Sequence, residues 1–349
     1  MKKGFTLIEL MVSITIVGVL MALALVAINR VRESSRRAQC FSNMKNVGTA
    51  LHSFYDARNQ YPPASEWSTP GEPLGNNRYP IGVIDRVTAT TEDDRLKGNW
   101  CIYLLPFSEE QSVYDNFDSR KPLHEQEMVY SVDIPFLKCP SDGYNTLDNH
   151  YQRSFTVKNK GYARANYALN AGTNKACMVN VREEDDPPCP DGWTAGGNNL
   201  EINNSQLWGS GIGGVNKTFR NGDFPSGLSN VVAFDEVLVG RHEWDRRGAW
   251  ALGFAGASIT AVHGGGPNGG ADEITGCSKI PVSYLRDLPC SPVESNMIKE
   301  VNMQGYSRSA HPGGVCVLLL DGSVKFIDDD IDKDLWREIH RRDSSKIIE

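Results

Sequence analysis

The 349-residue sequence predicts an α+β protein in which a long N-terminal helix packs on an antiparallel sheet with loop-rich insertions. Three observations predict this class. An apolar segment of helical length opens the chain, two apolar runs flank an Asp-Gly pair near its end, and 33 glycines with 18 prolines indicate many turns. We expect one globular α+β domain, residues 61–349, to follow a helix over residues 5–60.

The first half of the helix is predicted to cross a membrane. Residues 5–28 carry a single charge, Glu9, and at about 1.5 Å per residue they form roughly 36 Å of helix, enough to span a hydrocarbon core of about 30 Å. A signal peptide would have a shorter apolar stretch with a small-residue cleavage site after it. Because residues 29–37 are polar and compatible with a helix, we expect the anchor to be retained.

The second half, residues 29–58, is predicted to be amphipathic. Its apolar residues recur mostly every three or four positions, as on one face of a helix. They are Val31, Ala38, Phe41, Met44, Val47, Leu51 and Phe54. No proline occurs before Pro62-Pro63, which ends the helix. A partner-binding coiled coil is the alternative, but no heptad is sustained.

The middle of the chain gives weaker signals. Residues 62–99 and 142–221 are rich in glycine and asparagine and are predicted to be loops. Two short apolar segments, residues 100–107 and 136–141, are predicted to be buried. A strand is expected over residues 230–234, after a Pro-Ser-Gly turn.

The C-terminal region predicts a β-hairpin. Residues 315–320 and 323–327 are apolar runs separated by Asp321-Gly322, and Asp-Gly favours a type I′ turn with positive φ at both central residues. An amphipathic helix is expected over residues 331–339.

The segment Lys2-Lys3-Gly4-Phe5-Thr6-Leu7-Ile8-Glu9 resembles the leader and processing site of type IV pilins and type II secretion pseudopilins. The resemblance implies that residues 1–4 are a leader, that a prepilin peptidase cuts between Gly4 and Phe5, and that Phe5 is N-methylated. It also implies that Glu9 pairs with the terminal amine of a neighbouring subunit during assembly. The simpler alternative is a glutamate near a helix end that reaches the membrane interface.

The resemblance also implies a topology. Two lysines precede the apolar segment and four arginines follow it between residues 30 and 37, so the count of positive charges alone disfavours a cytoplasmic N-terminus. Long domains after the segment cross the membrane largely regardless of charge. We therefore expect a single-pass inner-membrane protein with a cytoplasmic N-terminus and a C-terminal domain in the periplasm or at the cell surface.

Further motifs resemble domain-of-unknown-function family 1559, whose members have a prepilin-type N-terminus and a His-x9-Asp-Gly motif near the C-terminus. The matching residues are Arg36-Arg37-Ala38-Gln39-Cys40, Leu137-Lys138-Cys139-Pro140-Ser141-Asp142, and His311 with Asp321-Gly322. Phe234-Asp235-Glu236 departs from the usual pattern. In an extended strand His311 and Asp321 would lie roughly 30 Å apart, so we interpret the motif as structural: Asp321-Gly322 forms the turn and His311 caps the start of the strand.

Eight cysteines are consistent with an oxidising compartment. Cys177 with Cys189 and Cys277 with Cys290 each bracket a loop-like stretch and are predicted to form local disulfides. The pairing of the other four cysteines stays open. Since no pair has CxxC spacing, a zinc knuckle is not expected.

Other functional classes are less consistent with the sequence. A net charge of −7 and a pI near 5.6 argue against nucleic acid as a partner. No catalytic constellation occurs, so we do not expect an enzyme or a cofactor. Residues 183–186 and 328–332 are acidic and could bind calcium, as some similar pseudopilins do, but neither matches the EF-hand pattern.

The expected function is therefore that of a membrane-anchored pilin-like or pseudopilin-like structural protein. Its expected partners are the membrane, a prepilin peptidase and methylase, and other pilin-like subunits in a filament or secretion-related structure. The alternative is a membrane-tethered surface binding module that does not polymerise and whose ligand is unknown.

Overall fold

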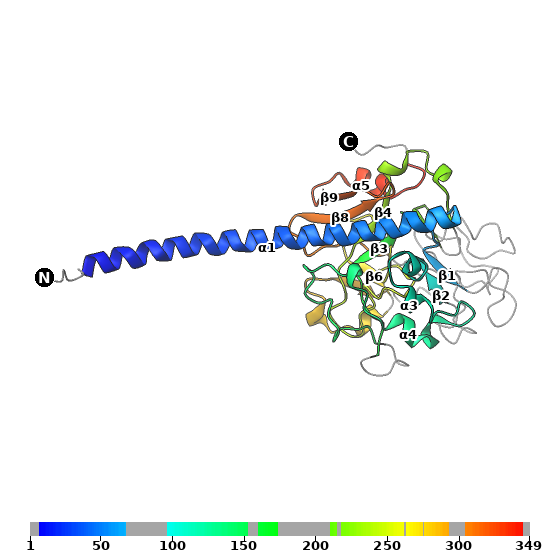
Figure 1. The fold of residues 1–349 in the computed structure, drawn as a ribbon, viewed down its shortest axis with the longest axis horizontal. Helices are drawn as coiled ribbons and strands as arrows, with labels where there is room; N and C mark the ends of the chain where they lie inside the picture. The colour runs from blue at the N-terminus through cyan, green and yellow to red at the C-terminus, as the bar shows by residue number, and fades with distance from the viewer. Residues whose placement is uncertain are drawn as a thin grey trace.

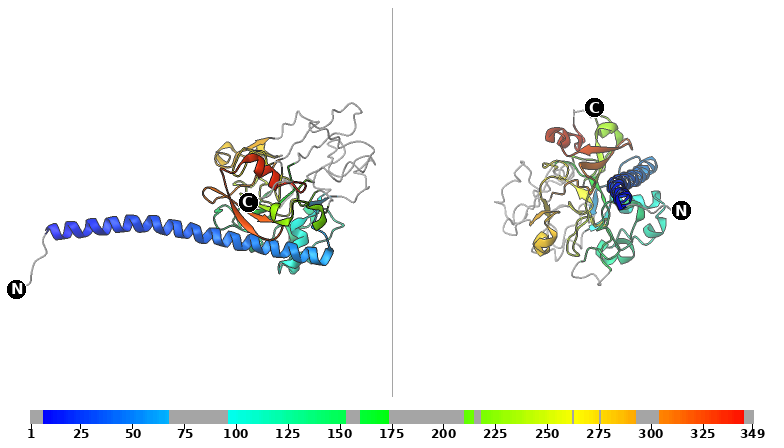
Figure 2. Two further views of the ribbon diagram at one scale, coloured as in Figure 1. Left: turned by 90° about the horizontal axis from the view of Figure 1, so that it is seen from above. Right: turned by 90° about the vertical axis from the view of Figure 1, so that its left-hand side faces the viewer.

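A helix that forms both the anchor and one side of the body dominates the computed structural model (Figure 1). The structure describes residues 7–67, 96–152, 160–173, 210–214, 218–261, 263–274, 276–292 and 304–344. Helix α1, Leu7–Arg58, has 52 residues, or roughly 78 Å at about 1.5 Å each. Its first half projects from the body as a rod, and its second half runs along one side of it (Figure 2).

Helix α1 ends where the sequence predicts. Asn59 has a positive φ of 54°, and its N–H donates to the carbonyl of Tyr55. Asparagine tolerates this left-handed conformation, which commonly ends a helix. The prolines at 62 and 63 then prevent the helix from continuing. In the described residues the helix therefore runs from Leu7 to Arg58.

The body is built around a sheet of five strands in the order β5-β3-β4-β8-β9. All neighbours are antiparallel except β3 and β5, which are parallel, so the predicted antiparallel sheet is mixed at one edge. The strands are β3 (Tyr167–Asn170), β4 (Val232–Glu236), β5 (Ile259–Thr260), β8 (Gly314–Leu319) and β9 (Val324–Asp328). Strand β3 lies in a region that the sequence predicted to be loop. The prediction missed it because all four residues are buried, so they show no alternation of apolar and polar residues.

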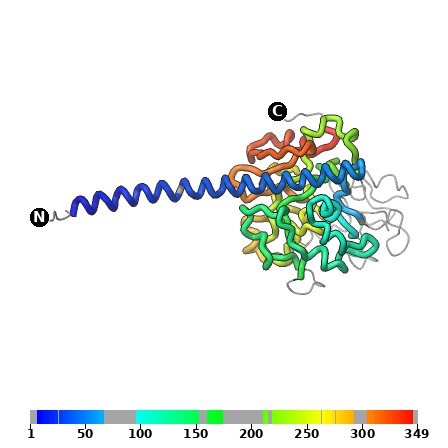
Figure 3. Tube along the Cα trace, viewed as in Figure 1, coloured from blue at the N-terminus to red at the C-terminus, as the bar shows by residue number. Residues whose placement is uncertain are grey.

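Both faces of the sheet are covered. Alternate residues of β8 and its turn contact the main core beside α1; they are Cys316, Leu318 and Leu320. The intervening residues pack with the C-terminal helix α5 (Lys333–Ile339); they are Val315, Val317 and Leu319. This double burial explains the uninterrupted apolar run in the sequence. Figure 3 shows the hairpin of β8 and β9 (orange) beside α1, which contacts both strands.

The turn between β8 and β9 differs from the predicted type I′ turn. Only Gly322 has a positive φ, 85°, whereas Asp321 does not. The N–H of Gly322 donates to the carbonyl of Leu319, and the N–H of Leu319 donates to that of Ser323. This is a three-residue loop, a type I turn followed by a left-handed glycine. The predicted hairpin is confirmed, but the predicted turn type was wrong. Strand β8 ends at Leu319, one residue earlier than expected, so the loop has three residues instead of two.

Short elements fill the rest of the body. Strand β1 (Ser65–Trp67) pairs antiparallel with β2 (Leu96–Asn99), in a region predicted to be loop, and β6 (Asp272–Ile274) pairs parallel with β7 (Cys290–Pro292). The short helices are α2 (Trp100–Leu104), α3 (Gln111–Tyr114) and α4 (Glu127–Tyr130). Single 3₁₀ turns are η2 (Leu105–Phe107), η3 (Leu123–Glu125), η4 (Pro135–Leu137), η6 (Asn221–Asp223), η7 (Leu228–Asn230), η8 (Cys277–Lys279) and η9 (Val282–Tyr284).

Candidate functional site

The anchor is the exposed first half of α1. All described side chains over residues 7–32 are exposed, and within the described part of the chain α1 is the one helix long and apolar enough to cross a membrane. Ser13 and Thr15 donate their hydroxyl protons to the carbonyls four residues earlier, 2.7 Å away in each case. These bonds satisfy the hydroxyls within an apolar helix. Glu9 lies on this anchor, whereas Gly4 and Phe5 lie outside the described residues.

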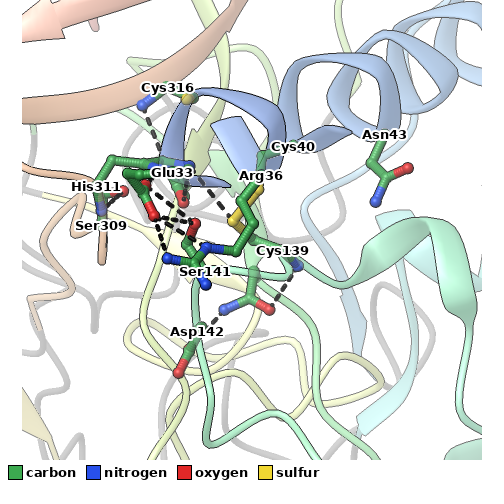
Figure 4. Close-up of polar contacts among 12 residues, drawn as sticks. Glu33, Arg36, Cys40, Asn43, Cys139, Ser141, Asp142, Ser309, His311 and Cys316 are labelled. Carbon is green, nitrogen blue, oxygen red and sulfur yellow. Dashed lines mark hydrogen bonds and ion pairs between the residues drawn. A yellow bond between two sulfur atoms is a disulfide. The ribbon is translucent and has the colours of Figure 1, made fainter. Parts of the chain in front are cut away.

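A polar cluster joins α1 to the body where the anchor ends (Figure 4). Nδ1 of buried His311 lies 2.5 Å from a carboxylate oxygen of Glu33, on α1. The Ser141 hydroxyl donates to the same carboxylate at 3.1 Å, and Arg36 lies 2.9 Å from it. The loop before β8 is therefore tied to α1 by a charged, partly buried contact.

A disulfide reinforces this junction. Cys40 of α1 is bonded to Cys139, with a Cα–Cα distance of 5.0 Å, and Nε2 of His311 lies 3.4 Å from the Cys139 sulfur. Next to it, the Asn43 amide donates to the carbonyl of Lys138 at 2.7 Å. The sequence left the pairing of Cys40 and Cys139 open, because they are 99 positions apart and only folding brings them together.

The other cysteines fall into three groups. Cys277 and Cys290 form the disulfide expected from their spacing. Cys177 and Cys189, the other pair predicted to be local, lie outside the described residues. Cys101 and Cys316 are buried free thiols, and burial raises the pKa of both, with the nearby Glu236 carboxylate adding to the effect at Cys316.

Two adjacent carboxylates of β4 serve opposite faces of the sheet. Glu236 lies on the α1 side, 3.6 Å from Nε2 of His311, and Asp235 lies on the α5 side, 2.9 Å from Nε2 of His340. All four side chains are buried. In the sequence, this pair stands out only as part of a departure from a family pattern. Two adjacent carboxylates at the end of an apolar run were the available signal, because successive residues of a strand face opposite ways.

The two carboxyls at the junction differ in pKa. Burial alone would raise the pKa of Glu33, but hydrogen bonds from His311, Arg36 and Ser141 outweigh it and hold the pKa below its ordinary value. Burial dominates at Glu236 and raises its pKa, although the His311 charge opposes this. The Glu33 carboxylate is therefore the more readily ionised partner of His311.

The residues of the His-x9-Asp-Gly motif do not meet in one site. His311 contacts Glu33 of α1, a contact that the sequence did not indicate. Asp321 is exposed and accepts hydrogen bonds from the backbone and hydroxyl of Ser323. A side chain at Gly322 would meet the ring of His52, 3.1 Å away, so this turn also approaches α1. Both ends of the motif thus face the same helix.

Of the two acidic stretches considered for calcium, the structure describes only residues 328–332. Residues 183–186 lie outside the described part. In the second stretch, Asp332 caps the N-terminus of α5 by accepting from the Leu335 N–H, and Asp329 accepts from the Asn268 amide. Among the described residues, two other groups bring potential metal ligands within 4.8 Å of one another: Cys40, Cys139, Glu236 and His311, and Asp235, His263 and His340.

Comparisons with known proteins match two successive parts of the chain. The model of the prokaryotic N-terminal methylation motif matches residues 1–25, and that of the family described as "Protein of unknown function (DUF1559)" matches residues 29–334. The type IV major pilin protein PilA of Myxococcus xanthus (strain DK1622) is 36% identical over 60 residues. That match covers 17% of this chain and 27% of the pilin. No solved structure matches the chain.

Proposed function

Because the chain belongs to the DUF1559 family and carries a prokaryotic N-terminal methylation motif, we propose that it is a processed, filament-forming pilin-like subunit. A prepilin peptidase removes residues 1–4, Phe5 is methylated, and the mature helix packs beside those of other subunits. The chain has no catalytic role in this proposal. The observation that carries it is a long, exposed apolar helix, with a methylation motif at its start, that is held firmly by a separate body (Figure 1).

Glu9 has a specific role in this assembly. A carboxylate within a membrane-spanning segment costs about 2.5–3.5 kcal/mol at the centre of the bilayer and less towards its edge. Cleavage after Gly4 creates a positive amine on Phe5, four residues away along the chain. Pairing of Glu9 with this amine on a neighbouring subunit offsets the cost and fixes the relative height of adjacent helices.

The same proposal sets the location and partners. The anchor crosses the inner membrane once, its N-terminus faces the cytoplasm, where the leader is cut, and the body lies in the periplasm or at the cell surface. Disulfides persist in those compartments, and two occur in the described body. The partners are the membrane, the peptidase and methylase, and further pilin-like subunits.

Mass spectrometry of the N-terminal peptide from the native host tests the processing step. We expect the mature chain to begin at Phe5 and to carry one added methyl group on its amine. An intact Met1, or a cut elsewhere, would contradict processing and leave a plain signal anchor.

Replacing Glu9 by alanine tests the assembly step. We expect Glu9→Ala to insert and fold normally but to be absent from sheared filaments. Thr15→Ala is the matched control, since it changes another polar side chain of the exposed anchor and removes only a bond within the helix. Normal filament incorporation of Glu9→Ala would rule out the role of the carboxylate.

A membrane-tethered binding module that does not polymerise is the second candidate. One observation favours it: the likeness to a pilin covers only 60 residues, whereas the family match covers residues 29–334, which include most of the body. Gentle detergent extraction followed by cross-linking separates the two functions. A ladder of regular oligomers supports the filament, and a monomer with a methylated N-terminus supports the tethered module.

A further inference from the structure

The junction between α1 and the body brings four potential metal ligands together around its disulfide. They are Cys40 of α1, Cys139 after η4, Glu236 of β4 and His311 before β8, and each offers one ligand atom within 4.8 Å of the others. All four side chains are buried. Figure 4 shows the sulfurs of Cys40 and Cys139 beside His311. Two sulfurs, one imidazole nitrogen and one carboxylate oxygen therefore share a small buried volume.

His311 presents its Nε2 to this volume. Its Nδ1 lies 2.5 Å from the Glu33 carboxylate, which accepts the proton of this nitrogen, so Nε2 of the neutral ring keeps its lone pair. Nε2 lies 3.4 Å from the Cys139 sulfur and 3.6 Å from a carboxylate oxygen of Glu236. An imidazole whose other nitrogen donates to a carboxylate is the usual arrangement of a metal-binding histidine.

The distances around His311 fit a tetrahedral zinc site. Zinc lies about 2.3 Å from a thiolate sulfur and about 2.0–2.2 Å from a nitrogen or carboxylate oxygen. In a tetrahedron, a sulfur and a nitrogen ligand are then roughly 3.5 Å apart, and a nitrogen and an oxygen ligand roughly 3.4 Å apart. The observed separations, 3.4 Å from His311 to Cys139 and 3.6 Å from His311 to Glu236, are close to these values.

The two sulfurs do not fit in the disulfide state, because the bond between Cys40 and Cys139 leaves no thiolate to bind a metal. Reduction breaks this bond. Rotation about the Cα–Cβ bonds then lets the sulfurs separate to the roughly 3.8 Å expected for two thiolates on one zinc ion. The same four side chains therefore have two mutually exclusive states, one with a disulfide and one with a metal ion.

We propose that the reduced junction binds one Zn²⁺ ion through Cys40, Cys139, His311 and Glu236, with Glu33 orienting the ring of His311. Two thiolates, one imidazole and one carboxylate are ligands that suit zinc. The cytoplasm keeps thiols reduced, so at the location proposed above each chain passes through this state before it is oxidised. The ion connects α1 to the body until the disulfide replaces it.

The exchange of zinc for the disulfide balances in atoms and electrons. A protein disulfide of the oxidising compartment accepts two electrons from the two thiolates, and the bond between Cys40 and Cys139 forms. Zinc leaves as Zn²⁺, and the two sulfurs of the oxidant take up two protons from water. The reverse exchange needs a dithiol reductant, which supplies both electrons and both protons.

The second group of potential ligands does not compete for this ion. It consists of Asp235, His263 and His340, and the two imidazole rings stack with their centroids 3.8 Å apart and 25° between their planes. The lone pairs of stacked rings lie in nearly parallel planes and cannot converge on one ion. The expected stoichiometry is therefore one ion for each reduced chain.

Zinc content of the full chain in both redox states tests the proposal. The chain is synthesised cell-free in detergent with a phosphine reductant and Zn²⁺, without a metal-affinity tag, and is then desalted. Elemental mass spectrometry should find about one zinc per chain, and X-ray absorption should show sulfur ligands together with lighter ligands. Oxidised glutathione should then release the ion in step with the loss of the two thiols. A folded, reduced chain without zinc, or zinc that stays bound once the disulfide has formed, would overturn the proposal.

Variants locate the ion. Replacing both Cys40 and Cys139 by serine should abolish zinc binding. Replacing Cys277 and Cys290 by serine is the matched control, because it removes the other described disulfide and should leave the zinc content unchanged. Glu33→Gln should weaken zinc affinity by about 10–100-fold, since the metal-binding ring loses the carboxylate that orients it. Equal zinc content in the two cysteine variants would place the ion elsewhere and contradict the assignment.

A measurement on the unmodified chain keeps the proposal testable if the variants fail to fold. Chelation of zinc from the reduced chain should lower its melting temperature by several degrees, and returning Zn²⁺ should restore it, because the ion binds only the folded junction. A melting temperature that changes in neither step would show that the reduced junction is held without a metal.

Discussion

At the scale of single residues, the contact between Glu33 of α1 and His311 of the body is a central part of the junction. Glu33 of α1 is only partly buried, whereas its partner His311 in the body is almost fully buried. A buried imidazole without its carboxylate loses a charged hydrogen bond and is left poorly solvated. The pair therefore matters more than the exposed charges around it.

Glu33→Gln tests the pair. We expect it to lower the free energy of unfolding by about 1–3 kcal/mol at neutral pH, since His311 loses its charged partner. Arg36→Gln is the matched control: Arg36 bonds the same carboxylate but is about half exposed, with 47% of its side chain accessible, and should cost under about 1 kcal/mol. Chemical denaturation in detergent measures both. Equal losses of unfolding free energy in the two variants would show that the contact with His311 adds no more stability than the exposed contact with Arg36.

The same pair predicts a pH dependence. The pKa of Glu33 in the folded protein lies below its ordinary value of 4.5, so the carboxylate stabilises the fold above about pH 4.5, and this contribution is lost as the pH falls through the lowered pKa. The difference in stability between the unmodified chain and Glu33→Gln should be full near pH 6 and disappear in stronger acid. A difference that grows below pH 4 would contradict this sign.

At the scale of elements, α1 combines two helices with different surroundings. Its first half is apolar all round and exposed, and its second half buries one stripe that includes Cys40, Met44, Val47 and Leu51. Two residues of the predicted stripe, Val31 and Ala38, are exposed instead. The stripe begins only where the body begins, and the period of the sequence does not mark that point.

Gly48 lies where α1 packs tightly against the sheet. A Cβ placed there would lie 3.0 Å from a terminal carbon of Leu318 in β8. We expect Gly48→Leu to lower the free energy of unfolding by about 2 kcal/mol or more through overpacking, despite the better helix propensity of leucine. Asn46→Leu, on the exposed face of the same helix, should change it by under about 0.5 kcal/mol. Stability of Gly48→Leu equal to that of the control would disprove the close packing.

The disulfide between Cys40 and Cys139 secures the same element. Because it closes a loop of 99 positions, replacing both cysteines by serine should lower the free energy of unfolding by about 2–5 kcal/mol. The pair Cys277 and Cys290 closes only 13 positions and serves as comparison, with a smaller expected loss. Denaturant titrations of the two double variants measure the difference. A larger loss for the short loop would show that strain or local contacts, and not chain entropy, dominate.

At the scale of the whole molecule, the structure is a body from which the first half of α1 projects (Figure 1). The body has a core of its own, and the described anchor side chains contribute nothing to it. Removing residues 1–30 should therefore leave a soluble, folded protein whose free energy of unfolding, measured by thermal and chemical denaturation, is close to that of the full chain. Removal of residues 1–45 is the control: it deletes Glu33 and Cys40, and we expect it to destabilise the body severely. Unfolding of the shorter truncation would show that the anchor supports the fold.

Several features followed from sequence alone because they depend on neighbours along the chain. The end of α1 at Arg58 needs only Asn59 and the two prolines, and the hairpin needs two apolar runs around Asp321-Gly322. The short loop between Cys277 and Cys290 makes their pairing a local event. Helical and strand periodicity, together with turn residues, carries this information.

The site contacts depended on tertiary structure. Glu33 and His311 are 278 positions apart, and Asp235 and His340 are 105 apart, so no window of the sequence contains either pair. Strand β3 escaped notice because burial on both faces removes the alternation that identifies a strand.

The sequence by itself therefore determined that this chain has a membrane-type N-terminal helix with a methylation motif, followed by an α+β body. Only the tertiary structure decided which carboxylate faces which histidine, which cysteine forms a disulfide with Cys40 of α1, and where along α1 the buried stripe begins. The physical reason is that local propensities act over a few residues, whereas burial and pairing are set by segments that meet only after the chain has folded.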